Sequence, residues 1–162
     1  MNVSLQWLSD HVDFSEYSMA QLDELLTFAG IEVEGIQSLP DHLVVGEVLS
    51  SEKHPDAEKL SVCQVDDGSG KPRQIVCGAK NYKVGDKVPL ALPGCVLDAG
   101  GGKTFTISEG KLRGVDSLGM MCSAKEIGLA EAADGLMILP ANLKPGTPLI
   151  EVFPAVFELE IT

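Results

Sequence analysis

The chain has 162 residues, the length of one or two compact domains, and it is 44% hydrophobic, 22% charged and 5% aromatic. This composition is typical of a globular protein and excludes disordered and fibrous classes. No run approaches the roughly 20 apolar residues of a membrane-spanning helix. The first segment, residues 1–12, contains no Lys or Arg and no continuous apolar run. We therefore expect no signal or transit peptide, a cytoplasmic location and no membrane partner.

Four cysteines, Cys63, Cys77, Cys95 and Cys122, are spread along the chain with no CxxC pair and no His at ligand spacing. This spacing argues against a structural zinc site and, without a secretion signal, against a disulfide framework. We expect no metal site, and we interpret the thiols as small apolar side chains of the strands and core.

The net charge of −12 is unevenly distributed. Residues 1–40 hold seven acids and residues 151–162 hold three, and neither segment contains a Lys or Arg. Residues 50–125 hold eleven bases and nine acids, so two acidic ends flank a nearly neutral middle. Such a change of composition predicts a domain boundary on each side of the middle.

Helical patterns open the chain. Residues 5–12 place apolar side chains at spacings of three and four, as on one face of a short helix. A second helix is better marked, because Ser18 and Gln21 form an S-x-x-Q capping box and Gly30 supplies a left-handed stop. The alternation of apolar and acidic residues over 31–34 then predicts a half-exposed strand.

The middle of the chain reads as many short β segments broken by Gly, Pro and Asp. Five or six short strands in about 80 residues fit a small barrel of the OB type. Pro89 cannot donate a ladder hydrogen bond, so we expect its strand to lie at an edge or a bulge. The predicted strands are residues 43–49, 60–65, 74–77, 87–92, 104–107 and 118–122.

The alternation of residues 31–34 returns at residues 157–161. We predict that residues 31–36 and 157–161 are neighbouring strands of one small sheet, with their apolar faces turned toward the second helix. The residues expected in this core are Val33, Phe157, Leu159 and Ile161, packed against Leu22, Leu25 and Leu26.

The string A-G-G-G-K-T at residues 99–104 resembles the end of a phosphate-binding loop. Leu97 occupies the position of the required first Gly, and a strand pattern follows where a helix is needed, so we predict a flexible hairpin loop. The three histidines lie in separate segments, and neither a nucleophile elbow nor an HExxH motif is present. We expect no catalytic residue in this segment.

Bases and turn residues alternate in four strings of the β-rich middle. Pro55 predicts that His54 is extended and leads into a turn, which the Asp56 side chain caps. Lys111 and Arg113, two apart, are expected on one face of a strand. If the barrel brings these loops together, they form a cationic rim with few aromatics, suited to backbone or shape recognition; a merely solvated rim is the alternative. The strings are V-G-E-V (45–48), K-H-P-D-A-E-K-L (53–60), R-Q-I-V-C-G-A-K-N (73–81) and K-L-R-G-V-D-S-L-G-M (111–120).

These strings, in this order over residues 44–122, resemble the tRNA-binding OB-fold family. That family occurs in free tRNA-binding proteins, in appendices of methionyl-tRNA synthetases and in the N-terminal part of the bacterial phenylalanyl-tRNA synthetase β subunit. The opening S-L-Q-W-L, F-A-G-I-E-V-E-G-I at residues 28–36 and the closing E-L-E-I-T resemble the last of these branches, over essentially the whole chain. There the closing string continues into a Pro-Asn-Arg segment, so we expect this chain to be an N-terminal fragment.

The resemblance implies an α+β fold with an inserted all-β domain. A five-stranded OB-fold barrel, residues 40–150, would be inserted into a small α+β domain made of residues 1–39 plus 151–162. The resemblance also implies a cytoplasmic α2β2 ligase, a class II aminoacyl-tRNA synthetase that attaches phenylalanine to tRNA with ATP and Mg²⁺. Its partners would be tRNA, the α subunit and the rest of the β subunit. This segment would be a non-catalytic tRNA-binding or structural module with no cofactor of its own.

The family resemblance also selects candidate RNA contacts. Two alternatives to the synthetase fragment stay open: a free-standing tRNA-binding protein, and a protein-docking barrel without an RNA role. Five bases in contact with phosphates would give a slope of log affinity against log salt of at most about −0.7 per phosphate, or roughly −3.5. The acids of the two ends should repel RNA, so we expect weak binding. The candidates are Lys53, His54, Lys59, Arg73, Asn81, Lys111, Arg113, Ser117 and Met120.

Overall fold

The computed structural model describes residues 1–161, without the side chain of residue 161. The chain forms two compact units. The small unit comprises Met1–Leu39 and Phe153–Thr162, of which residue 162 lies outside the described residues. The barrel unit comprises Pro40–Val152. No helix among the described residues has both the length and the apolar character needed to cross a membrane.

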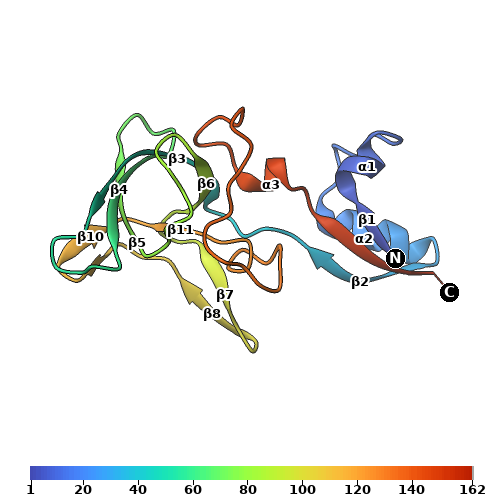
Figure 1. Ribbon diagram of the computed structural model, residues 1–162. Helices are drawn as coiled ribbons and strands as arrows, with labels where there is room; N and C mark the ends of the chain where they lie inside the picture. Colours follow the sequence, from blue (N-terminus) through green and yellow to red (C-terminus); the bar gives the residue numbers. More distant parts are fainter. Residues whose placement is uncertain (162) are drawn as a thin grey trace. The chain divides into compact units, whose positions relative to one another are not determined.

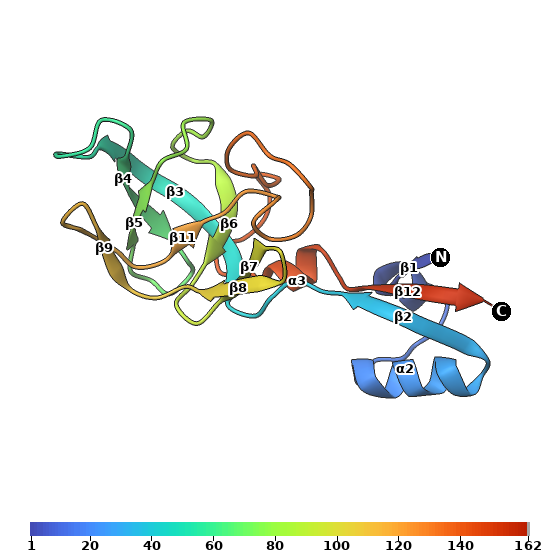
Figure 2. The same cartoon turned by 90° about the horizontal axis from the view of Figure 1, so that it is seen from below.

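The small unit is a three-stranded antiparallel sheet with two helices (Figure 1, Figure 2). Its strands lie in the order β1-β12-β2, so the last strand of the chain is central. Glu32 is paired with Glu160 and Ile36 with Phe157, which confirms the predicted pairing of the two alternating segments. The elements are β1 (Asn2–Ser4), α1 (Leu5–Ser9), α2 (Met19–Phe28), β2 (Ile31–Gln37) and β12 (Val156–Ile161).

The core of the small unit forms between α2 and one face of this sheet. Leu22, Phe157 and Leu159 are buried there, and Val33 and Leu26 pack against them, as predicted. Leu25 was expected in this core and is 51% exposed instead. A helix turns by about 100° per residue, so Leu25 lies about 60° from Leu22, beyond the stripe that a narrow sheet covers. The predicted role of Ile161 falls on a side chain outside the described residues.

The ends of α2 follow the sequence signals. The Ser18 hydroxyl accepts a hydrogen bond from the Gln21 backbone N–H at 3.3 Å, and the Gln21 side chain accepts one from the Ser18 N–H at 2.8 Å. Gly30 ends the helix with a φ of +86°, where a side chain would strain the backbone. The first helix, α1, ends at Ser9 and is therefore shorter than the predicted span of residues 5–12.

The barrel unit is built on a five-stranded antiparallel sheet in the order β11-β6-β3-β4-β5. The sheet curls until its outer strands approach each other, and the Leu118 N–H donates to the Gln74 carbonyl at 2.9 Å across that junction. The barrel is therefore nearly closed and OB-like. Its strands are β3 (Leu43–Lys53), β4 (Ser61–Asp66), β5 (Arg73–Cys77), β6 (Lys87–Ala91) and β11 (Met120–Met121).

The barrel core consists of inward-facing aliphatic side chains and cysteines. Val48, Val65, Ile75 and Leu90 are fully buried in it. Gly46 permits close packing, since a Cβ at this position would lie 2.9 Å from Val65 Cγ1. All four cysteines are buried and free, in agreement with their interpretation as small core residues.

Two further hairpins and one short helix extend from the barrel sheet. The β7–β8 hairpin turns at Gly100, Gly101 and Gly102, all with positive φ, so the glycine-rich string is the predicted hairpin loop. The elements are β7 (Val96–Gly100), β8 (Lys103–Thr106), β9 (Gly110–Leu112), β10 (Val115–Ser117) and α3 (Leu149–Val152).

Pro89 corrects one prediction, because its strand β6 is neither an edge nor bulged at this position. Pro89 is paired with Val45, whose N–H donates to the Thr147 carbonyl at 2.9 Å and so points away from β6. The Pro89 carbonyl accepts from the Cys122 N–H at 2.9 Å, just past the end of β11. The position of the missing proline N–H therefore faces Cys122, one residue beyond the paired residues of β11, so no strand hydrogen bond of β11 is lost.

Candidate nucleic-acid interface

Several of the candidate residues lie at one end of the barrel. Lys53, the last residue of β3, is paired with Ser61, which is paired in turn with Cys77 at the end of β5. The loop 54–60 joins β3 to β4 at this end, and Lys53 and Lys59 are both exposed. The register of three strands therefore places the K-H-P-D-A-E-K-L loop beside the residues that follow β5.

His54 does not present its ring to solvent. The residue is 2% exposed, although its neighbours Lys53 and Pro55 are exposed. Its Nδ1 accepts the Asp56 backbone N–H at 3.0 Å, and its Nε2 lies 3.1 Å from the Leu112 carbonyl oxygen. The imidazole ring of His54 thus caps the turn, in place of the predicted Asp56 side chain, and both of its nitrogen atoms are bonded within the protein.

The hairpin of β9 and β10 carries Lys111 and Arg113, but not on one strand face as predicted. Arg113 occupies the turn with φ +53° and Gly114 follows with φ +83°, between the paired Leu112 and Val115. Two successive positive φ values are those of a type I′ turn, whose twist suits a tight hairpin. Arg113 therefore projects from the tip of the hairpin and is exposed.

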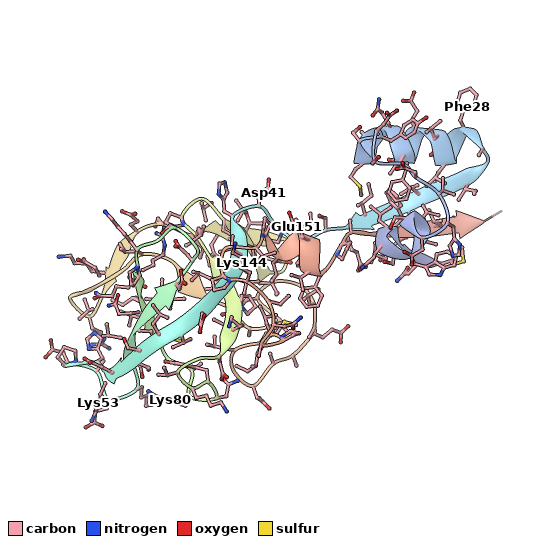
Figure 3. The ribbon with its side chains drawn as sticks, turned by 90° about the horizontal axis from the view of Figure 1, so that it is seen from above. Phe28, Asp41, Lys53, Lys80, Lys144 and Glu151 are labelled. Carbon is pink, nitrogen blue, oxygen red and sulfur yellow. The ribbon has the colours of Figure 1, made fainter. Side chains whose placement is uncertain are left out.

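Lys80 belongs to the same end of the barrel and was not among the candidates. Its Nζ donates to the Ser61 hydroxyl at 2.9 Å, and Ser61 is the register partner of Lys53. Figure 3 shows Lys53 and Lys80 at the same end of the unit. The pairing of the strands could have identified Lys80: β4 pairs with both β3 and β5, so a base shortly after the end of β5 lies near the end of β3. We call the five bases Lys53, Lys59, Lys80, Lys111 and Arg113 the cationic end.

Arg73 lies elsewhere. It starts β5, four residues from Cys77, which is about 13 Å along a strand at roughly 3.3 Å per residue. Its Nε donates to the Asp67 carboxylate at 2.9 Å and its Nη1 to the Leu118 carbonyl at 3.0 Å. Burial acts to raise the pKa of Asp67, but hydrogen bonds from Ser69 and Arg73, with the Arg73 charge, lower that pKa overall. The guanidinium group is thus engaged within the barrel.

Asn81 and Ser117 also bond to distant parts of the main chain. The Asn81 amide donates to the Leu136 carbonyl at 2.8 Å and accepts from the Leu136 N–H at 2.9 Å. The buried Ser117 hydroxyl accepts the Val76 N–H at 3.1 Å and donates to the Gly119 carbonyl at 3.1 Å. These two polar side chains hold the segments around the barrel end in place.

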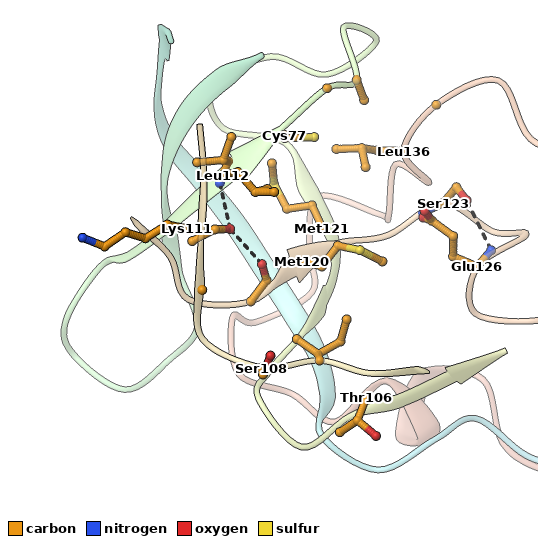
Figure 4. Close-up of a pocket in the computed structure, with 18 of the residues that line it drawn as sticks. Cys77, Thr106, Ser108, Lys111, Leu112, Met120, Met121, Ser123, Glu126 and Leu136 are labelled. Atoms are coloured by element: carbon orange, nitrogen blue, oxygen red, sulfur yellow. Dashed lines mark hydrogen bonds between the residues drawn. The ribbon is translucent and has the colours of Figure 1, made fainter. Parts of the chain in front are cut away.

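A pocket of about 590 Å³ adjoins the cationic end (Figure 4). Met120, half-buried, lines it together with Ser117 and Leu112. Its only charged lining residues are Lys111 and Glu126. A pocket of this kind, apolar with several hydroxyls, one base and one acid, contributes contact area more than charge.

The electrostatics of the cationic end are moderate. Its segments also carry exposed acids, and Lys111 lies 3.8 Å from Asp116 with 70% and 60% of the two side chains exposed. An ion pair so exposed contributes little and leaves Lys111 available to another anion. The acids on the same segments are Glu52, Asp56, Glu58 and Asp116.

A nearly closed five-stranded barrel with bases gathered at one end defines an OB-like nucleic-acid-binding class of protein. Residues 43–148 match the family model described as "Putative tRNA binding domain". The chain belongs to that family.

The chain is also similar to longer curated proteins. It is 49% identical to the phenylalanine–tRNA ligase beta subunit of Anaeromyxobacter dehalogenans over 93% of this chain and 18% of that protein. It is 45% identical to the beta subunit of Bdellovibrio bacteriovorus over 100% of this chain and 20% of that protein. The chain thus spans about a fifth of the length of these relatives. A solved structure, the MetRS related protein from Pyrococcus horikoshii, is 22% identical over 82% of this chain and 98% of that one, with a TM-score of 0.47.

Proposed function

We propose that the barrel unit binds tRNA through the cationic end, by contacts to the phosphate backbone. The observation that carries this proposal is the gathering of five bases from three separate strings at one end of a barrel in the tRNA-binding domain family. Main-chain bonds hold the loops that bear them, while four of the five ammonium or guanidinium groups make no hydrogen bond within the described residues. Free cations on fixed loops suit recognition of a phosphate pattern.

We further propose that the chain is the N-terminal portion of a phenylalanine–tRNA ligase β subunit, because curated relatives of that name match it over nearly all of its length. The barrel would be an insertion in a small α+β domain, which the two units of the chain support. The whole enzyme would be a cytoplasmic α2β2 assembly that uses ATP and Mg²⁺. In that assembly this segment would be a non-catalytic tRNA-binding and structural module.

Fluorescence anisotropy of labelled tRNA tests the binding proposal directly. We expect the 162-residue chain to bind tRNA at low salt, and we expect Lys53→Ala/Lys59→Ala/Lys80→Ala to weaken that binding at least tenfold. Lys71→Ala/Lys103→Ala/Lys144→Ala is the matched control, since it removes three exposed bases that lie outside the cationic end and outside the loop that carries Lys80. Equal losses in both triple variants would mean unspecific attraction, and no binding at low salt would favour the docking-barrel alternative.

A further inference from the structure

We infer that His54 is a positioning residue that holds two cationic segments together as one RNA-binding surface. The two segments are the loop 54–60, which follows Lys53 and contains Lys59, and the hairpin 110–117, with Lys111 and Arg113. This inference rests on the proposed function, and it assigns to His54 a role other than contact with RNA.

The contacts of His54 define its protonation form. The Asp56 N–H can only donate, so Nδ1 must accept, and the Leu112 carbonyl can only accept, so Nε2 must carry a hydrogen. The ring is therefore the neutral Nε2–H tautomer with both nitrogen atoms bonded. At 2% exposure, His54 has no unbonded ring nitrogen and almost no accessible surface to offer to a ligand.

The bond from Nε2 to Leu112 spans 58 residues of sequence. Among the hydrogen bonds of the described residues, it is the one that joins the loop to the hairpin. Leu112 is itself 48% exposed, so its side chain adds little apolar packing to this bond. The other strand of the hairpin is held separately, because the Gln74 side chain donates to the Asp116 carbonyl at 2.9 Å.

The hairpin needs such a tether. Its strands β9 and β10 have only three residues each, and an isolated two-stranded hairpin of this size is marginally stable in water. Without the bond from His54, the pairing with β10 would be the one remaining hydrogen-bonded support of strand β9 and of the turn that carries Arg113, among the described residues. RNA would then have to order the hairpin when it binds, which lowers affinity.

Two substitutions separate the two bonds of the ring. In His54→Asn the amide oxygen takes the place of Nδ1 and keeps the turn, but the side chain is too short to reach Leu112. In His54→Gln the amide nitrogen takes the place of Nε2 and keeps the tether. We expect His54→Asn to weaken tRNA binding by the 162-residue chain about tenfold, and His54→Gln to weaken it less than threefold.

A second measurement distinguishes positioning from a general loss of stability. In a Lys111→Ala/Arg113→Asn background the hairpin has no cation left to place, so His54→Asn should cause no additional loss of affinity. Amide hydrogen exchange of residues 111–115 should accelerate at least tenfold in His54→Asn, while exchange in β3 and β6 stays unchanged.

Each outcome decides the inference. Wild-type affinity in His54→Asn, or unchanged exchange in the hairpin, would overturn the role of His54 while leaving the proposed function intact. An equal loss of affinity with and without Lys111 and Arg113 would reduce His54 to a structural residue. No tRNA binding by the wild-type chain at low salt would overturn the proposed function, and the role of His54 with it.

Discussion

At the scale of single residues, the four strings of the barrel contain side chains that are bonded within the protein and bases that are exposed. His54, Arg73, Asn81 and Ser117 all bond to main-chain atoms that lie 41 to 58 residues away in the sequence. Such bonds require fixed geometry, and leaving one partner buried and unpaired costs about 1–3 kcal/mol. These four residues thus hold the loops in place, whereas the exposed bases Lys53, Lys59, Lys111 and Arg113 remain available for a ligand.

The Arg73–Asp67 pair makes stability depend on pH. The Asp67 side chain is 3% exposed, and hydrogen bonds to its charged form lower its pKa in the folded state. The stability it provides is fully present above the unfolded-state pKa, about 3.9, and is lost as pH falls through the lower folded pKa. We expect Asp67→Asn to lose about 2 kcal/mol of unfolding free energy at pH 7 and progressively less below pH 4. Urea denaturation of both chains at pH 7 and at pH 3 measures this loss of unfolding free energy.

Asp66→Asn is the matched control for that experiment. Asp66 accepts the Gly68 N–H at 2.8 Å in the same loop but has no arginine partner. Its substitution should cost less at pH 7 than that of Asp67. A cost of Asp67→Asn that stays constant from pH 7 to pH 3 would contradict the assigned role of the ion pair.

The four cysteines should react slowly in the folded chain. Burial raises the pKa of Cys77, Cys95 and Cys122, so these groups stay protonated near neutral pH. The Cys63 sulfur lies 3.0 Å from the Tyr82 hydroxyl, whose pKa burial and this contact raise to about 12. We expect a thiol reagent at pH 8 to modify the native chain at least tenfold more slowly than the denatured chain. Added zinc should leave the melting temperature unchanged, and a stoichiometric zinc complex would contradict this.

At the scale of elements, the turn of the β9–β10 hairpin can be tested without RNA. Gly114 has φ +83°, so Gly114→Ala should destabilise the hairpin by about 1 kcal/mol. Arg113 has φ +53°, a conformation that Asn adopts more easily, so Arg113→Asn removes the charge and keeps the turn. Hydrogen exchange of residues 111–115 should accelerate in Gly114→Ala and stay unchanged or slow down in Arg113→Asn. Faster exchange in both variants would argue against a type I′ turn.

The elements also show how far sequence patterns reach. The capping box of α2 and the alternation of β2 and β12 are local signals, so helix end, strand face and even strand pairing could be predicted. The exposure of Leu25 and the position of Pro89 in the sheet depend on which segment packs beside them, and no local sequence pattern gives that information. The same holds for His54 and Lys80, because their surroundings come from strand register and from a hairpin 58 residues away.

Strand β12 is the element on which the small unit depends. It lies between β1 and β2 and supplies the buried Phe157 and Leu159. A chain that ends at Pro154 should therefore lose the small unit, while the barrel unit keeps its own core. Trp7, the one tryptophan of the chain, lies in α1 and reports on the small unit by fluorescence. The loss of barrel signals in an NMR spectrum of this variant would contradict the independence of the two units.

At the scale of the whole molecule, charge is divided between the two units. The small unit carries nine acids and neither Lys nor Arg, and all twelve bases of the chain belong to the barrel unit. The barrel unit carries the other fifteen acids, so it is close to neutral, and five of its twelve bases form the cationic end. We expect such a chain to repel nucleic acid at long range, most strongly at low ionic strength where charges are least screened, and to attract it only close to the cationic end.

Salt dependence should measure how many phosphates the cationic end contacts. Five bases give a slope of log affinity against log salt of at most about −0.7 per phosphate, or roughly −3.5. We expect Lys111→Ala/Arg113→Asn to make this slope shallower by about 1.4, since two contacts are lost. Arg73→Lys is the control, because Arg73 is engaged with Asp67 and lies away from the cationic end. Its slope should equal that of the wild-type chain. A salt-independent affinity, or a slope that changes with Arg73 and not with Lys111 and Arg113, would place the RNA on another face of the barrel.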